Sequence, residues 1–211
     1  MLGEIDKPKL STKEMLKSTL SVFLMKDMIL LSITSAYIGI QWCFWLSVFP
    51  TCVAFTKTLG NENDKPVMLA LCVIFQGIGQ VGACIYMSMK LPKLRPKILT
   101  TVAIFIQLLM FGLVFLMFPK MSSLDNTYDE SIIKPIVPLT YVIPFFLGIG
   151  DVMLKSPMYT LIIRKLPGKS AEAFALFNFY QSLTCSTAFF YSTSLNLYWQ
   201  LEPKALVSLF K

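Results

Sequence analysis

The chain has 211 residues, of which 55% are hydrophobic and 15% are charged, and its formal net charge is +7. A mean hydropathy of +0.64 is too apolar for an ordinary soluble domain and is typical of a protein that has the lipid bilayer as its solvent. The absence of histidine removes the commonest general base and the commonest zinc ligand, so we expect no enzyme, no metal site and no cofactor.

Residues 1–27 are polar and of mixed charge, and they predict a cytoplasmic leader. Within this leader, Ser11 and Glu14 have the spacing of a capping box. Apolar residues follow at helical spacing, at Met15, Leu16, Leu20 and Phe23. The pattern predicts an amphipathic helix on the membrane surface, and a simple extension of the first membrane span fits it equally well.

Residues 28–201 contain five apolar runs that reach the length of about 20 residues needed to cross the hydrocarbon core of a bilayer. A sixth run follows them but is soon interrupted by Glu202, Pro203 and Lys204. The predicted fold class is therefore an all-α membrane protein with five full transmembrane helices, a truncated sixth and a tail at 202–211. The full spans are predicted at residues 28–49, 67–89, 98–118, 137–163 and 173–191, and the partial one at 195–201.

The basic residues are distributed unevenly between the two sides of these spans. The leader and the two links on its side of the membrane carry twelve lysines and arginines, whereas the opposite links carry four. Because basic residues accumulate on the cytoplasmic side, the N-terminus is predicted to be cytoplasmic. Membrane topology thus explains the positive net charge, and we expect no nucleic-acid binding.

Two charged residues lie inside the fourth apolar run, at Asp151 and Lys155. Four residues apart on a helix, they share one face in the favourable order for an ion pair, and Tyr159 continues that face. Charges at this depth cost roughly 2.5 to 3.5 kcal/mol each on insertion scales, so the chain is expected to use or pair them. A self-contained ion pair and a functional site fit equally well, and Pro157 is expected to loosen the helix beside them.

Uncharged polar residues inside other spans extend this candidate site. Gln76 and Gln80 share one helical face, as do Asn178 and Gln181. These four residues are candidates to line a central cavity together with Asp151, and the alternative is that they only make hydrogen bonds between packed helices. Trp42 and Trp45 fit a role as interfacial anchors.

Glycines recur in the second and fourth spans. Gly77, Gly79 and Gly82 match the spacing of a dinucleotide-binding loop, but their context is a membrane span rather than a strand-turn-helix. We therefore interpret them, together with Gly148 and Gly150, as positions where two helices approach closely.

Several short strings resemble the uncoordinated-93-like family of the major facilitator superfamily, over roughly residues 15 to 200. They are SAYIGIQ at 35–41, LGIGD at 147–151, AEAFALF at 171–177 and AFFYS at 188–192. Members of this family resemble a twelve-helix transporter built from two halves, and this chain resembles the second half only, with its leader in the place of the linker. Lys155-Ser156-Pro157 departs from the pattern, because uncharged polar residues are expected there.

The resemblance implies a polytopic accessory or regulatory subunit of potassium channels, or a receptor-trafficking factor, in the plasma or endosomal membrane and without catalysis. The partners it implies are membrane lipid and a potassium channel, a receptor or a complementary N-terminal half. The alternatives are half of a small-solute transporter and a truncated isoform that does not transport.

Overall fold

The protein is described by a computed structural model, and the regular structure in its described residues is helical. The described residues are 12–90, 95–119, 122–124, 131–192 and 197. The capping residue Ser11 and the predicted tail at 202–211 lie outside them, as does the predicted partial span at 195–201 except for Leu197.

Four helical segments of the described chain are long and apolar enough to cross a membrane, and they coincide with the first four predicted spans, with ends shifted by a few residues. The first span extends to Phe55, six residues beyond the predicted end at 49. The segments are α2 (Lys26–Cys43) continued by the π-helical turn η1 (Phe44–Val48) and α3 (Phe49–Phe55); η2 (Glu62–Asp64) with α4 (Lys65–Lys90); α5 (Pro96–Met117); and α6 (Val137–Lys165).

The fifth predicted span, 173–191, is present as helix α7 (Ser170–Ser192), but it is not among the four segments that are apolar enough to cross a membrane. Polar side chains along it, including Glu172, Asn178 and Gln181, lower its mean hydropathy. Of the five predicted full transmembrane helices, four therefore have the length and composition of a membrane span, and the fifth is a helix of more polar composition.

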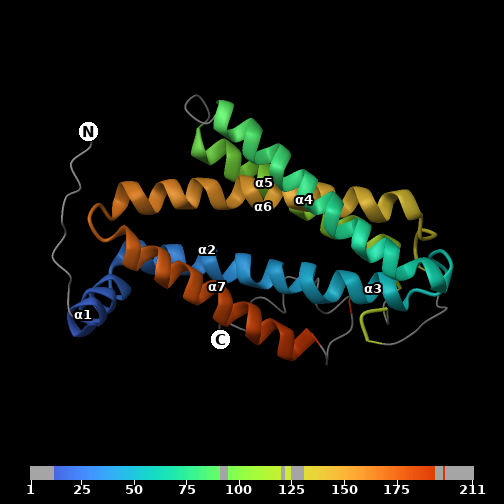
Figure 1. The fold of residues 1–211 in the computed structure, drawn as a ribbon, viewed down its shortest axis with the longest axis horizontal. Helices are drawn as coiled ribbons and strands as arrows, with labels where there is room; N and C mark the ends of the chain where they lie inside the picture. The colour runs from blue at the N-terminus through green and yellow to red at the C-terminus, as the bar shows by residue number, and fades with distance from the viewer. Residues whose placement is uncertain (1–11, 91–94, 120–121, 125–130, 193–196, 198–211) are drawn as a thin grey trace.

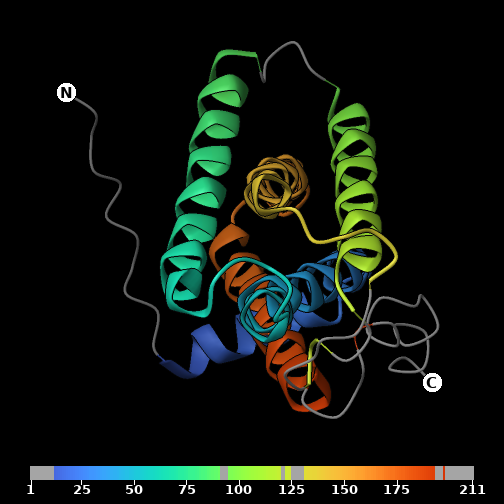
Figure 2. The same ribbon diagram turned by 90° about the vertical axis from the view of Figure 1, so that its right-hand side faces the viewer.

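The helices form two groups. In Figure 2, where α6 is seen end-on, α4 and α5 lie on either side of it, and α6 makes extensive contacts with both. The other group is α2 and α7, which pack against each other along their length. One end of the molecule, toward the left in Figure 1, holds α1 and the ends of α4, α6 and α7 that border the basic links. This arrangement agrees with the prediction that the basic links lie on one side of the spans. Which side of a membrane this end faces stays a prediction.

The predicted amphipathic segment forms a separate helix, α1 (Thr12–Phe23), and not an extension of the first span. Helical structure is interrupted at Met25, whose backbone is extended, before α2 begins. Ser18 of α1 donates a hydrogen bond of 2.9 Å to Glu172 of α7, and Val22 is fully buried. Its location on a membrane surface stays a prediction.

Glycines allow α4 and α6 to cross with their backbones in contact. A methyl group on Gly79 would collide with the carbonyl oxygen of Phe145, and one on Gly148 would collide with the carbonyl oxygen of Gln76. Gly150 is also crowded, because the side chain of Gln107 would lie 3.2 Å from an added methyl group. Three of the five glycines therefore lie where another helix approaches closely.

The other two predicted packing glycines face open space. No described atom lies within 4 Å of where a Cβ would stand on Gly77 or Gly82. Beside Gly82 the two helices diverge around an apolar hollow of about 430 Å³, lined also by Ile78, Tyr86 and Met153. Within the described chain, the packing role predicted for Gly77 and Gly82 is therefore not seen.

We predict that Gly148→Ala will destabilise the protein, because the added methyl group must push α6 away from the Gln76 backbone. Overpacking of this kind typically costs about 1 to 3 kcal/mol. Gly77→Ala is the matched control, since it adds the same group in open space and gains about 0.5 to 1 kcal/mol of helix stability. Thermal unfolding of the two variants in detergent should give midpoints on opposite sides of the unchanged protein, and equal shifts would contradict the close crossing.

A buried lysine caps the C-terminal end of α3. Lys65 at the start of α4 is only 7% exposed, and its ammonium donates hydrogen bonds of 2.5 Å to the carbonyl of Ala54 and 3.0 Å to that of Thr56. The last carbonyls of a helix carry partial negative charge and lack partners within the helix. Lys65 therefore satisfies them and fixes the turn between the first and second spans.

Lys65→Met is expected to lower the free energy of unfolding by about 1.5 to 3 kcal/mol, the range for hydrogen bonds to a charged group. Lys134→Met removes the same charge from an exposed position and should change stability little. The measurement is the unfolding midpoint of both purified variants. Equal effects at the two positions would show that Lys65 contributes only its charge.

Candidate functional site

The carboxylate of Asp151 lies in the middle of α6 and accepts hydrogen bonds from three helices. Lys155, one turn later in α6, approaches it to 2.9 Å, so the two predicted charges lie together as an ion pair. Gln80 of α4 donates its Nε2–H at 3.2 Å, and Trp42 of α2 donates its indole N–H at 3.3 Å. We call these four residues the Asp151 cluster.

The charged pair of the cluster is largely shielded and balanced in charge, whereas Trp42 is 39% exposed. Asp151 is 4% exposed, and the Lys155 side chain is 12% exposed. The Lys155 ammonium also lies 3.9 Å from the centre of the Trp42 ring, a cation–π contact. Taking two charges out of water is repaid only when the pair has good geometry and additional hydrogen bonds, and the indole and the Gln80 amide supply those bonds.

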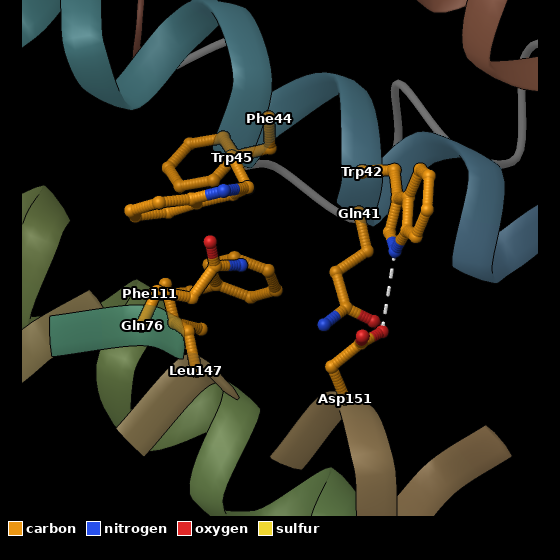
Figure 3. A pocket seen from close by; sticks show the side chains of 8 residues that line it. All are labelled: Gln41, Trp42, Phe44, Trp45, Gln76, Phe111, Leu147 and Asp151. Atoms are coloured by element: carbon orange, nitrogen blue, oxygen red, sulfur yellow. Dashed lines mark hydrogen bonds between the residues drawn. The ribbon is translucent and has the colours of Figure 1, made fainter. Parts of the chain in front are cut away.

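A small cavity adjoins the carboxylate. Its volume is about 10 Å³, about the least that holds one water molecule. Figure 3 shows the Gln41 side chain reaching from α2 toward the Asp151 carboxylate, with Gln76 and Phe111 on the other side. The Gln41 amide oxygen is buried without a hydrogen-bond partner in the described chain, and a half-turn of the amide would place its NH2 group, a donor, toward Asp151 instead. The remaining lining residues are Trp42, Phe44, Trp45 and Leu147.

The aromatic wall of this cavity comes from a π-helical turn. Phe44–Val48 is wound more widely than the α-helix on either side of it. Pro50 follows in the first turn of α3 and has no N–H to donate to the preceding turn, which disfavours a regular α-helix there. The turn brings Phe44 and Trp45 to the cavity. By contrast, α6 continues through Pro144 and Pro157, so the loosening expected at Pro157 does not interrupt that helix.

A second polar contact links α2 to α5. The hydroxyl of Tyr37 donates a 3.0 Å hydrogen bond to Oε1 of Gln107, which is fully buried. The nitrogen of the same amide is buried without a hydrogen-bond partner in the described chain. The two polar contacts therefore join α2 to the other group of helices, one at Asp151 of α6 and one at Gln107 of α5.

Three of the predicted site residues lie away from the cluster. Tyr159 packs edge-on against Phe174 and Phe177 of α7, with ring centres 5.4 and 5.8 Å away. Asn178 is exposed. Gln181 is buried, and its backbone carbonyl faces Gly39 of α2. The structure thus joins Asp151, Lys155, Gln80 and Gln76 around one point and leaves these three outside it.

Sequence reasoning missed the contribution of α2. Trp42 was interpreted as an interfacial anchor, but its indole N–H and its ring both contact the ion pair. Gln41 was not among the candidate site residues. The signal that could have identified both is their adjacency, since consecutive hydrogen-bonding side chains in an apolar helix need partners on a neighbouring helix.

Comparison with known proteins gives the family. Residues 3–210 match the family described as ion channel regulatory protein UNC-93. The chain belongs to the UNC-93 family. It is 32% identical over 190 residues to the UNC93-like protein MFSD11 of Xenopus tropicalis, and 31% identical to that of Xenopus laevis. In both cases the match covers 88% of this chain and 42% of the relative.

This UNC-93 family chain therefore spans about two fifths of the length of the curated relatives it matches. Its family lies within the major facilitator superfamily and is not known as a family of enzymes. No solved structure matches the chain.

We predict that Asp151→Asn and Lys155→Gln will each destabilise the protein, because each leaves the other charge buried without its counter-charge. Breaking a buried pair in this way costs roughly 3 to 5 kcal/mol. The double variant should recover much of the loss, since two neutral amides leave no buried charge. The measurement is a double-mutant cycle on unfolding midpoints in detergent.

Asp27→Asn provides the control for this cycle. Asp27 and Lys165 form an exposed ion pair at 4.0 Å, which is worth about 0 to 1 kcal/mol. If the double variant at 151 and 155 is as unstable as the sum of the single variants, the two residues do not act as a pair.

Proposed function

We propose that the chain acts as an accessory subunit of a membrane assembly, through contacts between its helices and a potassium channel or a trafficked receptor, without catalysing a reaction. The observation that carries this proposal is the family match over residues 3–210, because the family is described by its regulation of ion channels.

The closed polar site supports the same reading. The Asp151 carboxylate is occupied by donors from α2, α4 and α6, and the cavity beside it has room for about one water molecule. A solute-binding site usually encloses about 300 Å³ or more. This polar centre therefore suits a structural joint better than a solute site.

The lipid-facing composition supports contacts with other membrane helices. Large apolar side chains on α4 and α5 are exposed, among them Ile74, Ile78, Phe105 and Leu108. In a membrane these surfaces meet either lipid or the helices of a partner, and open glycines such as Gly82 let a partner helix approach closely.

A second function, one half of a solute transporter, is favoured by the charged pair itself. Ionisable residues inside membrane spans often mark ion or substrate pathways. The chain spans about two fifths of its relatives' length, so such a function would need a complementary half.

The experiment is to co-express the tagged chain with a potassium channel and to measure the whole-cell potassium current and the chain's state on a blue-native gel. An accessory subunit should migrate with the channel and change its current density or surface level. The Gly148→Ala variant is the folding-defective control and should do so less than Gly77→Ala. Solute uptake by vesicles that contain the chain together with a co-purified complementary half, and no effect on any channel or receptor, would favour the transporter instead.

A further inference from the structure

A groove lies between α1 and α7 at the basic end of the molecule. Its volume is about 290 Å³, and it is lined by Leu16, Thr19, Leu20 and Phe23 of α1 and by Leu176 of α7. Lys17 is the charged residue in this lining. The site is thus an apolar groove with the Lys17 ammonium group at its edge.

The helix that forms one wall is held in place from its opposite face. Val22 is buried, Ser18 is bonded to Glu172, and the ammonium of Lys169 donates a 3.0 Å hydrogen bond to Ser21. Phe23 also stacks on Tyr180 of α7, with ring centres 5.9 Å apart. The groove is therefore already formed in this structure, because α1 is packed against α7.

The outer face of α1 is apolar and exposed. Leu16 and Leu20, one turn apart, are 68% and 65% exposed, and Leu24 beyond the helix end is 73% exposed. Helices with such a face and with lysines at its edge lie in the headgroup region of a bilayer, where the lysine stems cover apolar surface and the ammonium groups reach phosphate.

The charged residues near this face of α1 are mostly basic, which bears on the kind of ligand that the groove can bind. Lys17 lines the groove, and Lys13, one turn before it on the same face of α1, is exposed. Lys26, Lys165 and Lys169 lie at the same end of the molecule, and there Asp27 faces Lys165 and Glu172 accepts from Ser18. A basic cluster on an amphipathic helix next to a membrane span favours anionic over zwitterionic lipid.

We propose that the groove between α1 and α7 binds one anionic phospholipid, with an acyl chain between Leu20 and Leu176 and the headgroup phosphate against Lys17 and Lys13. The charge complementarity and the apolar lining both point to a lipid rather than to a free phosphate, since an inorganic anion would leave the groove empty. This inference does not depend on the proposed accessory role.

The test is native mass spectrometry of the full chain released from nanodiscs of phosphatidylcholine with added phosphatidylserine. The unchanged protein should retain phosphatidylserine in preference to phosphatidylcholine. Lys13→Gln with Lys17→Gln should weaken this retention by about fivefold for each lysine, from roughly 1 kcal/mol per basic residue near an anionic surface. Lys97→Gln, an exposed lysine at the same end on α5, is the matched control and should leave it unchanged.

A second variant, Leu20→Asn, tests the acyl chain. It should reduce the retention of both lipids, and soluble glycerophosphoserine should not displace phosphatidylserine from the unchanged protein. The proposal would be overturned if Lys97→Gln lost as much phosphatidylserine as the lysine double variant, or if Leu20→Asn retained both lipids fully. Displacement of phosphatidylserine by glycerophosphoserine, or a dimer that carries no lipid, would also overturn it.

Discussion

The Asp151 carboxylate is the point on which the two groups of helices depend. Helix α6 packs with α4 and α5, whereas α2 packs with α7, and direct contact between α2 and α6 is limited. The indole of Trp42 crosses this seam to reach the carboxylate, and its ring also covers the Lys155 ammonium. This polar contact adds to apolar contacts that also cross the seam, such as Phe44 with Phe111 and Phe49 with Phe118. Apolar packing alone is weak in a membrane, because lipid tails compete equally for apolar surfaces.

Two apolar clusters lie on either side of this polar layer. One contains Phe49, Phe118 and Leu147 toward the α3 end, and the other contains Met28, Leu154 and Phe177 toward the α1 end. Leu147 and Leu154 are one turn before and one turn after Asp151 on α6. Because water is excluded from both sides, the electrostatic contacts between them are strengthened, and an unpaired member would be correspondingly costly.

The sequence predicted what depends on local spacing. Asp151 and Lys155 are one helical turn apart, and Gln76 and Gln80 share a face, so these contacts could be inferred without a structure. The sequence could not tell which distant side chain completes the cluster, because the register between α2 and α6 is set by tertiary packing. Trp42 therefore looked like an interfacial residue. The same limitation applies to Asn178 and Gln181, because residue spacing does not determine which face of their helix is turned toward the neighbouring helices.

The reciprocal crossing of α4 and α6 restricts how these two helices can move. Gly79 rests on the backbone of α6 at Phe145, and Gly148 rests on the backbone of α4 at Gln76. Sliding either helix along its axis would drive a neighbouring side chain into a carbonyl group, whereas rotation about the crossing keeps both contacts. The crossing therefore permits rotation of the two helices more easily than sliding. A rotation about it would widen or close the hollow beside Gly82, whereas Gln80 and Asp151, which lie close to the crossing, would keep nearly the same separation.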